Sequence, residues 1–155
     1  MRLTLTKQAE YALRALVWLA QEEAADRGRG QSGRHKAATI STAVGIPPQF
    51  AARVLAQLQR RGLLFARAGQ HGGYTLARPA EAVSILQVVE AVEGPLRSGT
   101  CVLREANCSS DGTCLLHGAW SAAQDSLRAI LSRTSIAATT TAATTPTTQT
   151  FAPAD

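Results

Sequence analysis

Acidic residues are missing from a long internal stretch of the chain. Residues 27–80 contain nine Lys or Arg and no Asp or Glu, although the 155-residue sequence has 16 basic and 11 acidic residues in all. The net charge of +5 therefore comes from this stretch. A block of one sign creates a positive field, for which polyanions are the usual partners, while charge alone leaves open a basic surface that has no partner.

A long apolar segment is also missing. Lys7, Glu10 and Arg14 interrupt the apolar residues near the N-terminus, and no stretch reaches the roughly 18–20 apolar residues of a membrane span. We therefore expect no secretory signal, no membrane partner and a cytoplasmic location. Aromatic residues make up only 5% of the chain, but the hydrophobic fraction of 45% is enough to fill the core of one domain.

Cysteine is scarce and confined to one segment. Cys101, Cys108 and Cys114 are the three cysteines of the chain, and His117 follows closely. In a reducing compartment, a cluster of this kind favours metal or redox chemistry over a structural disulfide.

The first half of the chain has the pattern of two helices joined by a tight turn. We expect, in order, a helix over 7–25, a mobile Gly- and Arg-rich connector at 26–36, a short helix at 39–44, a turn at Gly45–Ile46, and a second helix from Pro47 or Pro48 to Arg61. Proline suits the first turn of a helix, and Gly62 provides a C-terminal stop. We expect the buried stripe of the second helix to consist of Phe50, Val54, Leu55 and Leu58.

The second half begins with a Gly-rich turn between two short apolar stretches, "LLFARAGQHGGYTLAR", which predicts a β-hairpin. We expect the rest to comprise a short connecting helix at 81–95, a loop at 96–117 that carries the cysteines, a helix at 117–136 and a disordered Thr- and Ala-rich tail at 137–155. The long helix has apolar residues at the spacing of a coiled-coil seam: Leu116, Trp120, Ala123, Leu127 and Ile130 or Leu131.

This order of elements predicts a mainly α fold with a small β-hairpin wing, that is, a winged helix-turn-helix domain at 1–80 followed by a long C-terminal helix. In such a domain the second helix of the motif enters the DNA major groove. Gln49 and Arg53 would lie nearest the bases, where Gln can pair with adenine and Arg with guanine. The other DNA-binding candidates are Gln57, Arg60 and Arg61 on the same helix and Arg67 and His71 in the wing.

The cysteine segment is compatible with several chemistries. Three Cys and one His can hold zinc, but gaps of six and five residues between thiols are wider than the paired spacing of structural zinc sites. An iron–sulfur cluster spans a larger volume and fits a looser loop. A catalytic Cys114–His117 pair would need a substrate pocket, for which the sequence gives no sign, so we expect no enzymatic activity. Cysteines without a role stay a further alternative.

Several of these motifs together resemble one known family. The segments "MRLTLTKQAEYALRAL", "GIPPQFAARVLAQLQRRGLL", "GQHGGYTLARP" and "VVEAVEGP", with the three-cysteine loop before a long helix, are similar to the Rrf family of bacterial winged-helix regulators, which includes IscR-, NsrR- and RirA-like proteins. The resemblance extends from residue 1 to about 136 and leaves out the Thr/Ala tail.

The resemblance implies a homodimer joined through the long helix, with Trp120, Leu127, Ile130 and Leu131 in the interface. It also implies a [2Fe-2S] or [4Fe-4S] cluster on Cys101, Cys108 and Cys114. In IscR-like proteins the fourth ligand is a histidine that corresponds to His117. In NsrR-like proteins it is a carboxylate of the partner subunit's first helix, to which Glu10 corresponds best.

The implied function is that of a transcriptional repressor whose binding to double-stranded operator DNA responds to nitric oxide, redox stress or iron status. A zinc-bound or metal-free winged-helix regulator is the alternative. Two positions depart from the pattern of many relatives: Ala68 stands where they have an arginine before the first wing glycine, and Ala52 stands at an often polar position. These departures weaken the transfer of any known operator sequence.

Overall fold

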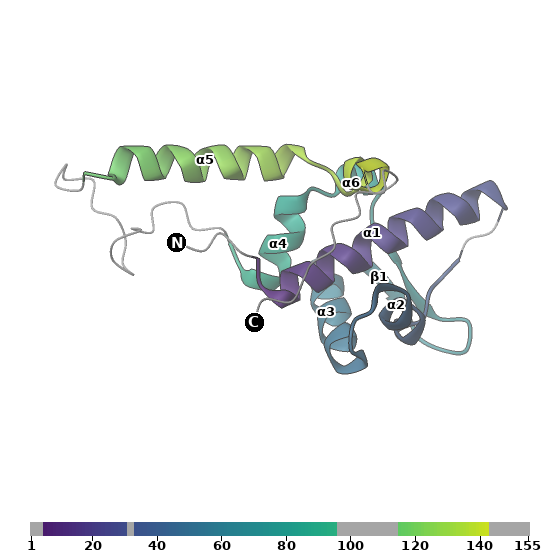
Figure 1. The fold of residues 1–155 in the computed structure, drawn as a ribbon. Coiled ribbons are helices and arrows are strands. Elements are labelled where there is room, and N and C mark those ends of the chain that lie inside the picture. Colours follow the sequence, from purple (N-terminus) through teal and green to yellow (C-terminus); the bar gives the residue numbers. More distant parts are fainter. Residues whose placement is uncertain (1–4, 31–32, 96–114, 143–155) are drawn as a thin grey trace, which may run out of the picture.

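The computed structural model describes residues 5–30, 33–95 and 115–142. Its elements, shown in Figure 1, are the helices α1 (Lys7–Gly28), α2 (Ala37–Val44), α3 (Pro48–Arg60), α4 (Ile85–Glu93), α5 (His117–Arg133) and α6 (Ile136–Ala142), the strands β1 (Leu64–Arg67) and β2 (Gly73–Leu76), and the 3-10 turn Ala80–Ala82. The fold is thus mainly helical with one two-stranded hairpin, as the sequence predicts.

Helix α1 is longer than the sequence pattern indicates. It begins at the N-cap Thr6, whose hydroxyl oxygen accepts a hydrogen bond from the Ala9 N–H, and it continues to Gly28. The expectation of a mobile connector from residue 26 is therefore wrong at its start. Asp26 is buried in α1, and its carboxylate lies 3.6 Å from Nε2 of His35, near the end of the predicted connector. This contact ties the last turn of α1 to the chain that follows.

Helices α2 and α3 form the predicted helix-turn-helix, and their apolar sides pack against α1. The buried residues of α3 are Ala51, Val54, Leu55 and Leu58, all at most 2% exposed. The assignment of Phe50 to this buried stripe is wrong, because Phe50 is 47% exposed. Phe50 lies one residue before Ala51 on the helix, which turns its ring to the flank of α3, where it contacts Tyr11.

The predicted hairpin is present, with β1 and β2 antiparallel and Leu64 paired with Leu76 and Arg67 with Gly73. A third short stretch extends the hairpin, because the backbone of His35 exchanges two hydrogen bonds with that of Tyr74, of 3.1 and 2.8 Å. The wing is therefore attached to the chain between α1 and α2 by backbone hydrogen bonds.

Helix α4 begins four residues later than expected. The chain from 81 first completes a 3-10 turn, and Ser84 then caps α4 in a reciprocal arrangement with Gln87. The intervening backbone is extended because it pairs with residues after α5: the Ile136 N–H donates to the Val83 carbonyl at 2.8 Å, and the Ile85 N–H to the Thr134 carbonyl at 2.9 Å. Helix α4 packs against α1, α3 and α5, so it connects the helices of the N-terminal domain to α5.

The described C-terminal residues, 115–142, form two helices rather than one. Helix α5 ends at Arg133, and α6 packs against α1. The expectation of a disordered tail from residue 137 is wrong as far as Ala142, because the side chain of Ile136 is fully buried in the core and fixes the start of α6 there. Residues 143–155 of the predicted tail lie outside the described residues.

Candidate nucleic-acid interface and metal-ligand candidates

The turn between α2 and α3 is fixed by its own hydrogen bonds. Gly45 adopts a left-handed conformation with φ of 64°, which glycine adopts without steric cost. The buried Ser41 hydroxyl donates to the Ile46 carbonyl at 2.6 Å, and the Ile46 N–H donates back to the Ser41 carbonyl at 2.9 Å. Pro48 then starts α3. The angle between the two helices is therefore set by local sequence.

One face of α3 is polar and exposed. Gln49, Arg53 and Arg60 are all exposed and follow one another at steps of four and seven residues, which places them on a single face of the helix. This face lies opposite the buried residues Val54 and Leu58. The first two side chains lie in the first half of α3, and Arg60 is its last residue.

Gln57 does not belong to this exposed face. Its side chain is half-buried, and its carbonyl oxygen accepts a hydrogen bond from the amide of Gln8 on α1. This contact does not support the predicted role of Gln57 in DNA binding, which stays a prediction. Each step of four residues rotates the side chain by about 40° around the helix axis, so Gln57, eight residues after Gln49, lies nearer α1. Phe50, about two turns before Gln57, also contacts α1, through Tyr11.

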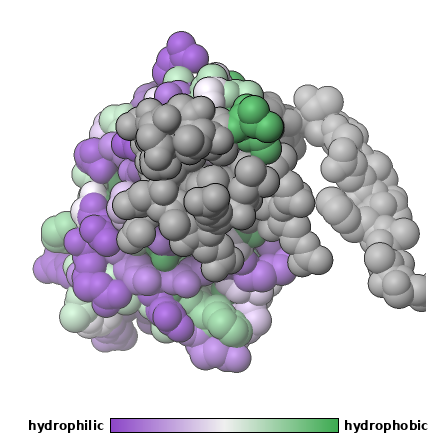
Figure 2. Space-filling model, turned by 90° about the vertical axis from the view of Figure 1, so that its left-hand side faces the viewer, coloured by the Kyte–Doolittle hydropathy of each residue, from purple (hydrophilic) through white to green (hydrophobic). Residues whose placement is uncertain are grey.

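The exposed arginines of α3 and the wing have no acidic partner among the residues that the structure describes. Within the described part of the chain, none of Arg53, Arg60, Arg61 and Arg67 forms an ion pair with a carboxylate. Since no acidic residue occurs between 27 and 80, their charges add up to a positive surface along α3 and the wing. In Figure 2 the face below the grey atoms, on the side of α2 and α3, is mostly hydrophilic with a few scattered apolar side chains.

The wing turn brings Arg67 and His71 to the surface, where both are exposed. Its sharp path depends on two glycines. A Cβ atom at Gly72 would lie 2.2 Å from the Arg67 carbonyl oxygen, and one at Gly73 would lie 2.7 Å from the His35 carbonyl oxygen. No other residue could follow this path without shifting the backbone.

A carboxylate of α1 holds the other side of the wing. Oε1 of Glu23 accepts a hydrogen bond from the Leu76 N–H at 2.6 Å. Trp18, one turn and a half earlier on α1, meets the His35 ring edge-on with centroids 4.9 Å apart. Sequence reasoning missed Glu23, Trp18 and His35 as wing supports, because no local signal links them to a hairpin some fifty residues later. The wing is thus held on the C-terminal half of α1.

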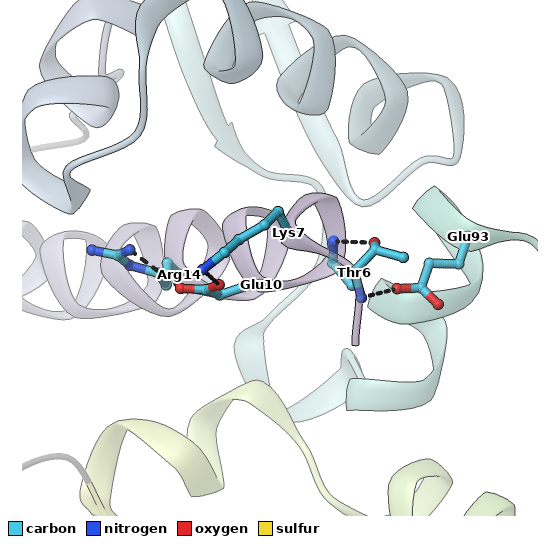
Figure 3. A network of polar contacts seen from close by, with 6 residues as sticks. Thr6, Lys7, Glu10, Arg14 and Glu93 are labelled. Atoms are coloured by element: carbon cyan, nitrogen blue, oxygen red, sulfur yellow. Dashed lines mark hydrogen bonds and ion pairs between the residues drawn. The ribbon is translucent and has the colours of Figure 1, made fainter. Parts of the chain in front are cut away.

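Glu10 lies in a network of polar contacts at the N-terminal end of α1 (Figure 3). Its carboxylate accepts a hydrogen bond from Nζ of Lys7 at 2.8 Å and lies 3.5 Å from the Arg14 guanidinium. In the same view, the Thr6 N–H donates to Oε1 of Glu93 at 2.8 Å. This bond joins the start of α1 to the end of α4.

The electrostatics of this network favour an ionised carboxylate. The hydrogen bond from Lys7, together with the positive charges of Lys7 and Arg14, lowers the pKa of Glu10, and desolvation opposes this only in part. In return, the hydrogen bond to Glu10 raises the pKa of Lys7. The Glu10 carboxylate is 41% exposed, so it is an anionic oxygen donor within reach of other groups.

Of the other candidate metal ligands, His117 lies within the described residues and the three cysteines do not. His117 is half-buried and is the first residue of α5. Cys101, Cys108 and Cys114 lie outside the described residues, so the proposed ligand set is not tested by the structure. Among the residues that are described, no group of three or more His, Cys, Asp or Glu is arranged to hold a metal ion.

None of the helices in the described ranges is long and apolar enough to cross a membrane.

The predicted dimer residues of α5 divide into two groups. Trp120 and Leu131 are half-buried within the subunit, and Leu131 packs against its hydrophobic core. Leu127 and Ile130 are 38% and 56% exposed, and α5 as a whole buries none of its residues. Figure 1 shows α5 along the edge of the molecule that lies away from α2 and α3. The helix thus presents apolar side chains on a face that the subunit leaves uncovered.

Comparison with known proteins identifies what these features are similar to. The family model Rrf2, described as an iron-dependent transcriptional regulator, matches residues 5–141. Rv1287 of Mycobacterium tuberculosis (strain H37Rv), named as an HTH-type transcriptional regulator, is 35% identical over 134 residues, which cover 86% of this chain and 78% of the relative. The HTH-type transcriptional regulator IscR of Photorhabdus laumondii is 28% identical over 85% of this chain and 76% of its own.

Solved structures show the same fold. CymR, the global cysteine regulator of B. subtilis, superposes with a TM-score of 0.73 at 17% identity, covering 91% of this chain and 98% of its own. IscR of T. potens superposes with a TM-score of 0.68 at 20% identity, covering 91% of this chain and 88% of its own. At these identities the likeness concerns the fold alone.

Proposed function

The chain belongs to the Rrf2 family of transcriptional regulators, and from this premise we propose that it is a dimeric repressor whose binding to operator DNA is controlled by an iron–sulfur cluster. The observation that carries the proposal is the exposed face of α3 with Gln49, Arg53 and Arg60, on which neither arginine pairs with a carboxylate of the described residues. Such a surface suits a major groove lined by phosphates.

The residues of this surface divide by the chemistry that they offer. Gln49 and Arg53, in the first half of α3, would read base edges, with Gln on adenine and Arg on guanine. Arg60 and Arg61 at the far end of α3, and Arg67 and His71 on the wing, would contact the sugar–phosphate backbone. The first group would set the sequence preference and the second most of the salt dependence.

The donors available in the chain fit an iron–sulfur cluster. Three cysteines offer thiolates, and Glu10 offers an exposed carboxylate that its neighbours keep ionised. The Thr6–Glu93 hydrogen bond holds the start of α1 against the end of α4, and the cysteine-bearing segment follows α4 in sequence. Cys101, Cys108 and Cys114 would hold the cluster, with His117 or Glu10 of the partner subunit as fourth ligand.

When bound, the cluster would supply iron that nitric oxide or oxygen can attack and that iron shortage can remove. The chain's own part is to connect the ligand segment with the DNA-binding surface. His117 begins α5, and Glu10 lies on α1, against which α2 and α3 pack. A change in ligation would therefore act on the helices that position the two copies of α3, and DNA half-sites tolerate little change in spacing.

The uncovered face of α5 supports the homodimer. Leu127 and Ile130 are exposed three residues apart, so they lie on the same side of the helix. A twofold dimer would bring the same apolar patch of each subunit into contact with that of its partner. The half-buried Trp120 and Leu131 would line the edge of this patch.

The first experiment is the visible absorption spectrum of anaerobically purified protein, with iron and acid-labile sulfide counted per chain. We expect a coloured protein with equal amounts of iron and sulfide, because thiolate-bound clusters absorb visible light and zinc does not. A colourless protein with one zinc per chain would instead support the zinc-bound alternative. A colourless protein without metal would leave a metal-free DNA-binding regulator.

The second experiment asks whether the cluster controls DNA binding. Operator duplexes would be selected from genomic fragments, and their affinity measured with anaerobic and with air-treated protein. We expect Cys108→Ala to lose iron and to bind the operator with the affinity of the air-treated protein. The matched control Ser109→Ala, one residue away, should keep both iron and response. Unchanged metal content and unchanged operator binding in the Cys108 variant would contradict the sensor proposal.

The fourth ligand can be assigned by a pair of variants. Glu10→Gln removes the anionic oxygen while keeping the side-chain size, and His117→Ala removes the imidazole. We expect one of the two variants to purify with altered visible bands and less iron, and the other to match the wild type. If both variants kept the wild-type spectrum, neither residue would be the ligand.

A further inference from the structure

Phe50 is an aromatic side chain that the core of the domain does not use. It is 47% exposed, whereas the apolar residues that follow it on α3, Ala51, Val54 and Leu55, are at most 2% exposed. One side of its environment is fixed, because the Tyr11 ring on α1 lies at a centroid distance of 6.0 Å and an angle of 56°. The remainder of the ring faces solvent from the first turn of α3.

Phe50 lies beside the residues of α3 that are proposed to contact the bases. It is the direct neighbour of Gln49 and precedes Arg53 by three residues, so it borders the two side chains that face the bases in the proposed complex. The first turn of α3 thus presents an amide, a guanidinium and an aromatic ring. Tyr11 holds the ring beside the two polar groups rather than letting it collapse onto α3.

The chemistry of the major groove offers one apolar group to match. Thymine displays its C5 methyl there, and apolar side chains including Phe contact it, whereas the other bases present hydrogen-bond donors and acceptors. We propose that Phe50 is a specificity-determining residue that recognises a thymine methyl group next to the bases read by Gln49 and Arg53. This inference rests on the proposed DNA-binding function and adds a third reader to it.

The test replaces thymine by uracil, which differs only by the absence of the methyl group. Within a selected operator, each thymine is changed to uracil in turn, and the Kd is measured for wild-type protein and for Phe50→Ala. We expect wild-type affinity to fall about fourfold at one thymine of each half-site, the ratio that corresponds to one buried methyl group. Phe50→Ala should bind thymine and uracil operators equally.

Two further variants make the result specific. Phe65→Ala removes another exposed ring, 58% exposed on β1, and should keep the full difference between thymine and uracil. Phe50→Leu keeps an apolar side chain and should retain part of the difference, and its circular dichroism and melting temperature show that the fold is intact. The fold of Phe50→Ala is checked in the same way.

The outcomes separate this inference from the function on which it rests. If Phe50→Ala keeps the wild-type difference between thymine and uracil, or if no thymine of the operator shows a difference with wild-type protein, the inference is overturned while DNA binding stands. If no duplex binds the wild-type protein in a salt-dependent manner, the proposed function fails together with the inference.

Discussion

At the scale of single residues, the state of the Glu10 carboxylate can be measured directly. The hydrogen bond from Lys7, with the charges of Lys7 and Arg14, lowers the pKa of Glu10. We expect an NMR titration of the Glu10 side chain to give a pKa below that of an ordinary glutamate. Lys7→Met should return the pKa toward the ordinary value, because the first cause of the shift is then removed.

The sign of the pH dependence follows from the direction of this shift. Since the pKa of Glu10 is lower in the folded state, the ion pair stabilises the fold above the unfolded-state pKa, and this contribution is lost as the pH falls through the folded-state pKa. Solvent screening keeps the effect on stability small, because the carboxylate is 41% exposed. Lys36→Met, which removes another exposed lysine, is the control and should leave the pKa of Glu10 unchanged. A Glu10 pKa at or above the ordinary value would show that the Lys7 contact does not form in solution.

The arginines of α3 should differ in what they contribute to DNA binding. Arg53→Ala is expected to weaken operator binding by about 1–3 kcal/mol and to relax the preference at one base pair, because a bidentate contact to guanine is lost. Arg60→Ala should weaken binding to all sequences alike and reduce the salt slope by about one unit. Both are measured as Kd against salt for the operator and for a scrambled duplex.

Gln57→Ala serves as the matched control within the same helix. Its amide is engaged with Gln8 on α1, so operator affinity and salt slope should stay close to those of the wild type. A loss of affinity comparable to that of Arg53→Ala would mean that Gln57 turns toward DNA on binding. An Arg53 variant with unchanged base preference would show that this guanidinium contacts phosphate only.

At the scale of elements, we expect α6 to contribute to the free energy of unfolding, although the sequence predicts a disordered tail there. Ile136 is fully buried in the core, and its N–H donates to the Val83 carbonyl at 2.8 Å. We expect Ile136→Ala to lower the free energy of unfolding by about 2–5 kcal/mol, the cost of emptying a buried aliphatic site. The measurement is urea unfolding at one protein concentration, since dimerisation would otherwise change the result.

Two truncations test the same point without creating a cavity. Removal of 143–155, which the composition predicts to be a polar tail, should leave the free energy of unfolding unchanged. Removal of 134–155 should lower it at least as much as Ile136→Ala, because α6 and its backbone bonds to 83–85 are both lost. Equal stability of the two truncated chains would exclude a structural role for α6.

The elements that the sequence predicts correctly are those with local signals. Gly45 marks the turn of the helix-turn-helix, and Gly72 and Gly73 mark the wing, because the backbone at these positions favours glycine. Pro48 marks the start of α3, because proline suits the first turn of a helix. The family resemblance is confirmed by the comparisons, and it too rests on these motifs. The α2–turn–α3 unit could therefore be placed without a structure.

What the sequence does not predict depends on contacts between distant segments. A Thr- and Ala-rich segment looks disordered by composition, and only the pocket that receives Ile136 makes its start a helix. Phe50 lies at the border between the buried and exposed sides of α3, where periodicity does not decide, and the neighbouring Tyr11 comes from another helix. The cysteine ligands are predicted by sequence alone and stay a prediction.

At the scale of the whole molecule, the proposed dimer and the DNA-binding surface lie at opposite ends of the subunit. Figure 1 shows α5 at the edge away from α3, with α4 between them. Helix α4 packs against both, so a series of packed helices links the proposed dimer interface on α5 to α3. In a twofold dimer this link fixes the separation of the two copies of α3, which should match half-sites one helical turn apart.

A single charge should disrupt the proposed dimer interface. Ile130→Asp would place a carboxylate in the apolar patch of α5, where the wild-type side chain is 56% exposed in the subunit. An unpaired charge at an interface costs several kcal/mol, so we expect dimer affinity to fall at least about a hundredfold. Sedimentation equilibrium measures this change.

Ser132→Asp is the matched control for the charge. It adds the same side chain two residues away, where Ser132 is exposed on a different side of α5 from Leu127 and Ile130. It should remain a dimer and bind the operator normally. The Ile130 variant should bind a DNA duplex with a single half-site with the same Kd as the wild type. Its affinity should rise little when a second half-site is added, because that rise requires two α3 helices linked in one dimer. A dimeric Ile130→Asp protein would place the interface on another surface.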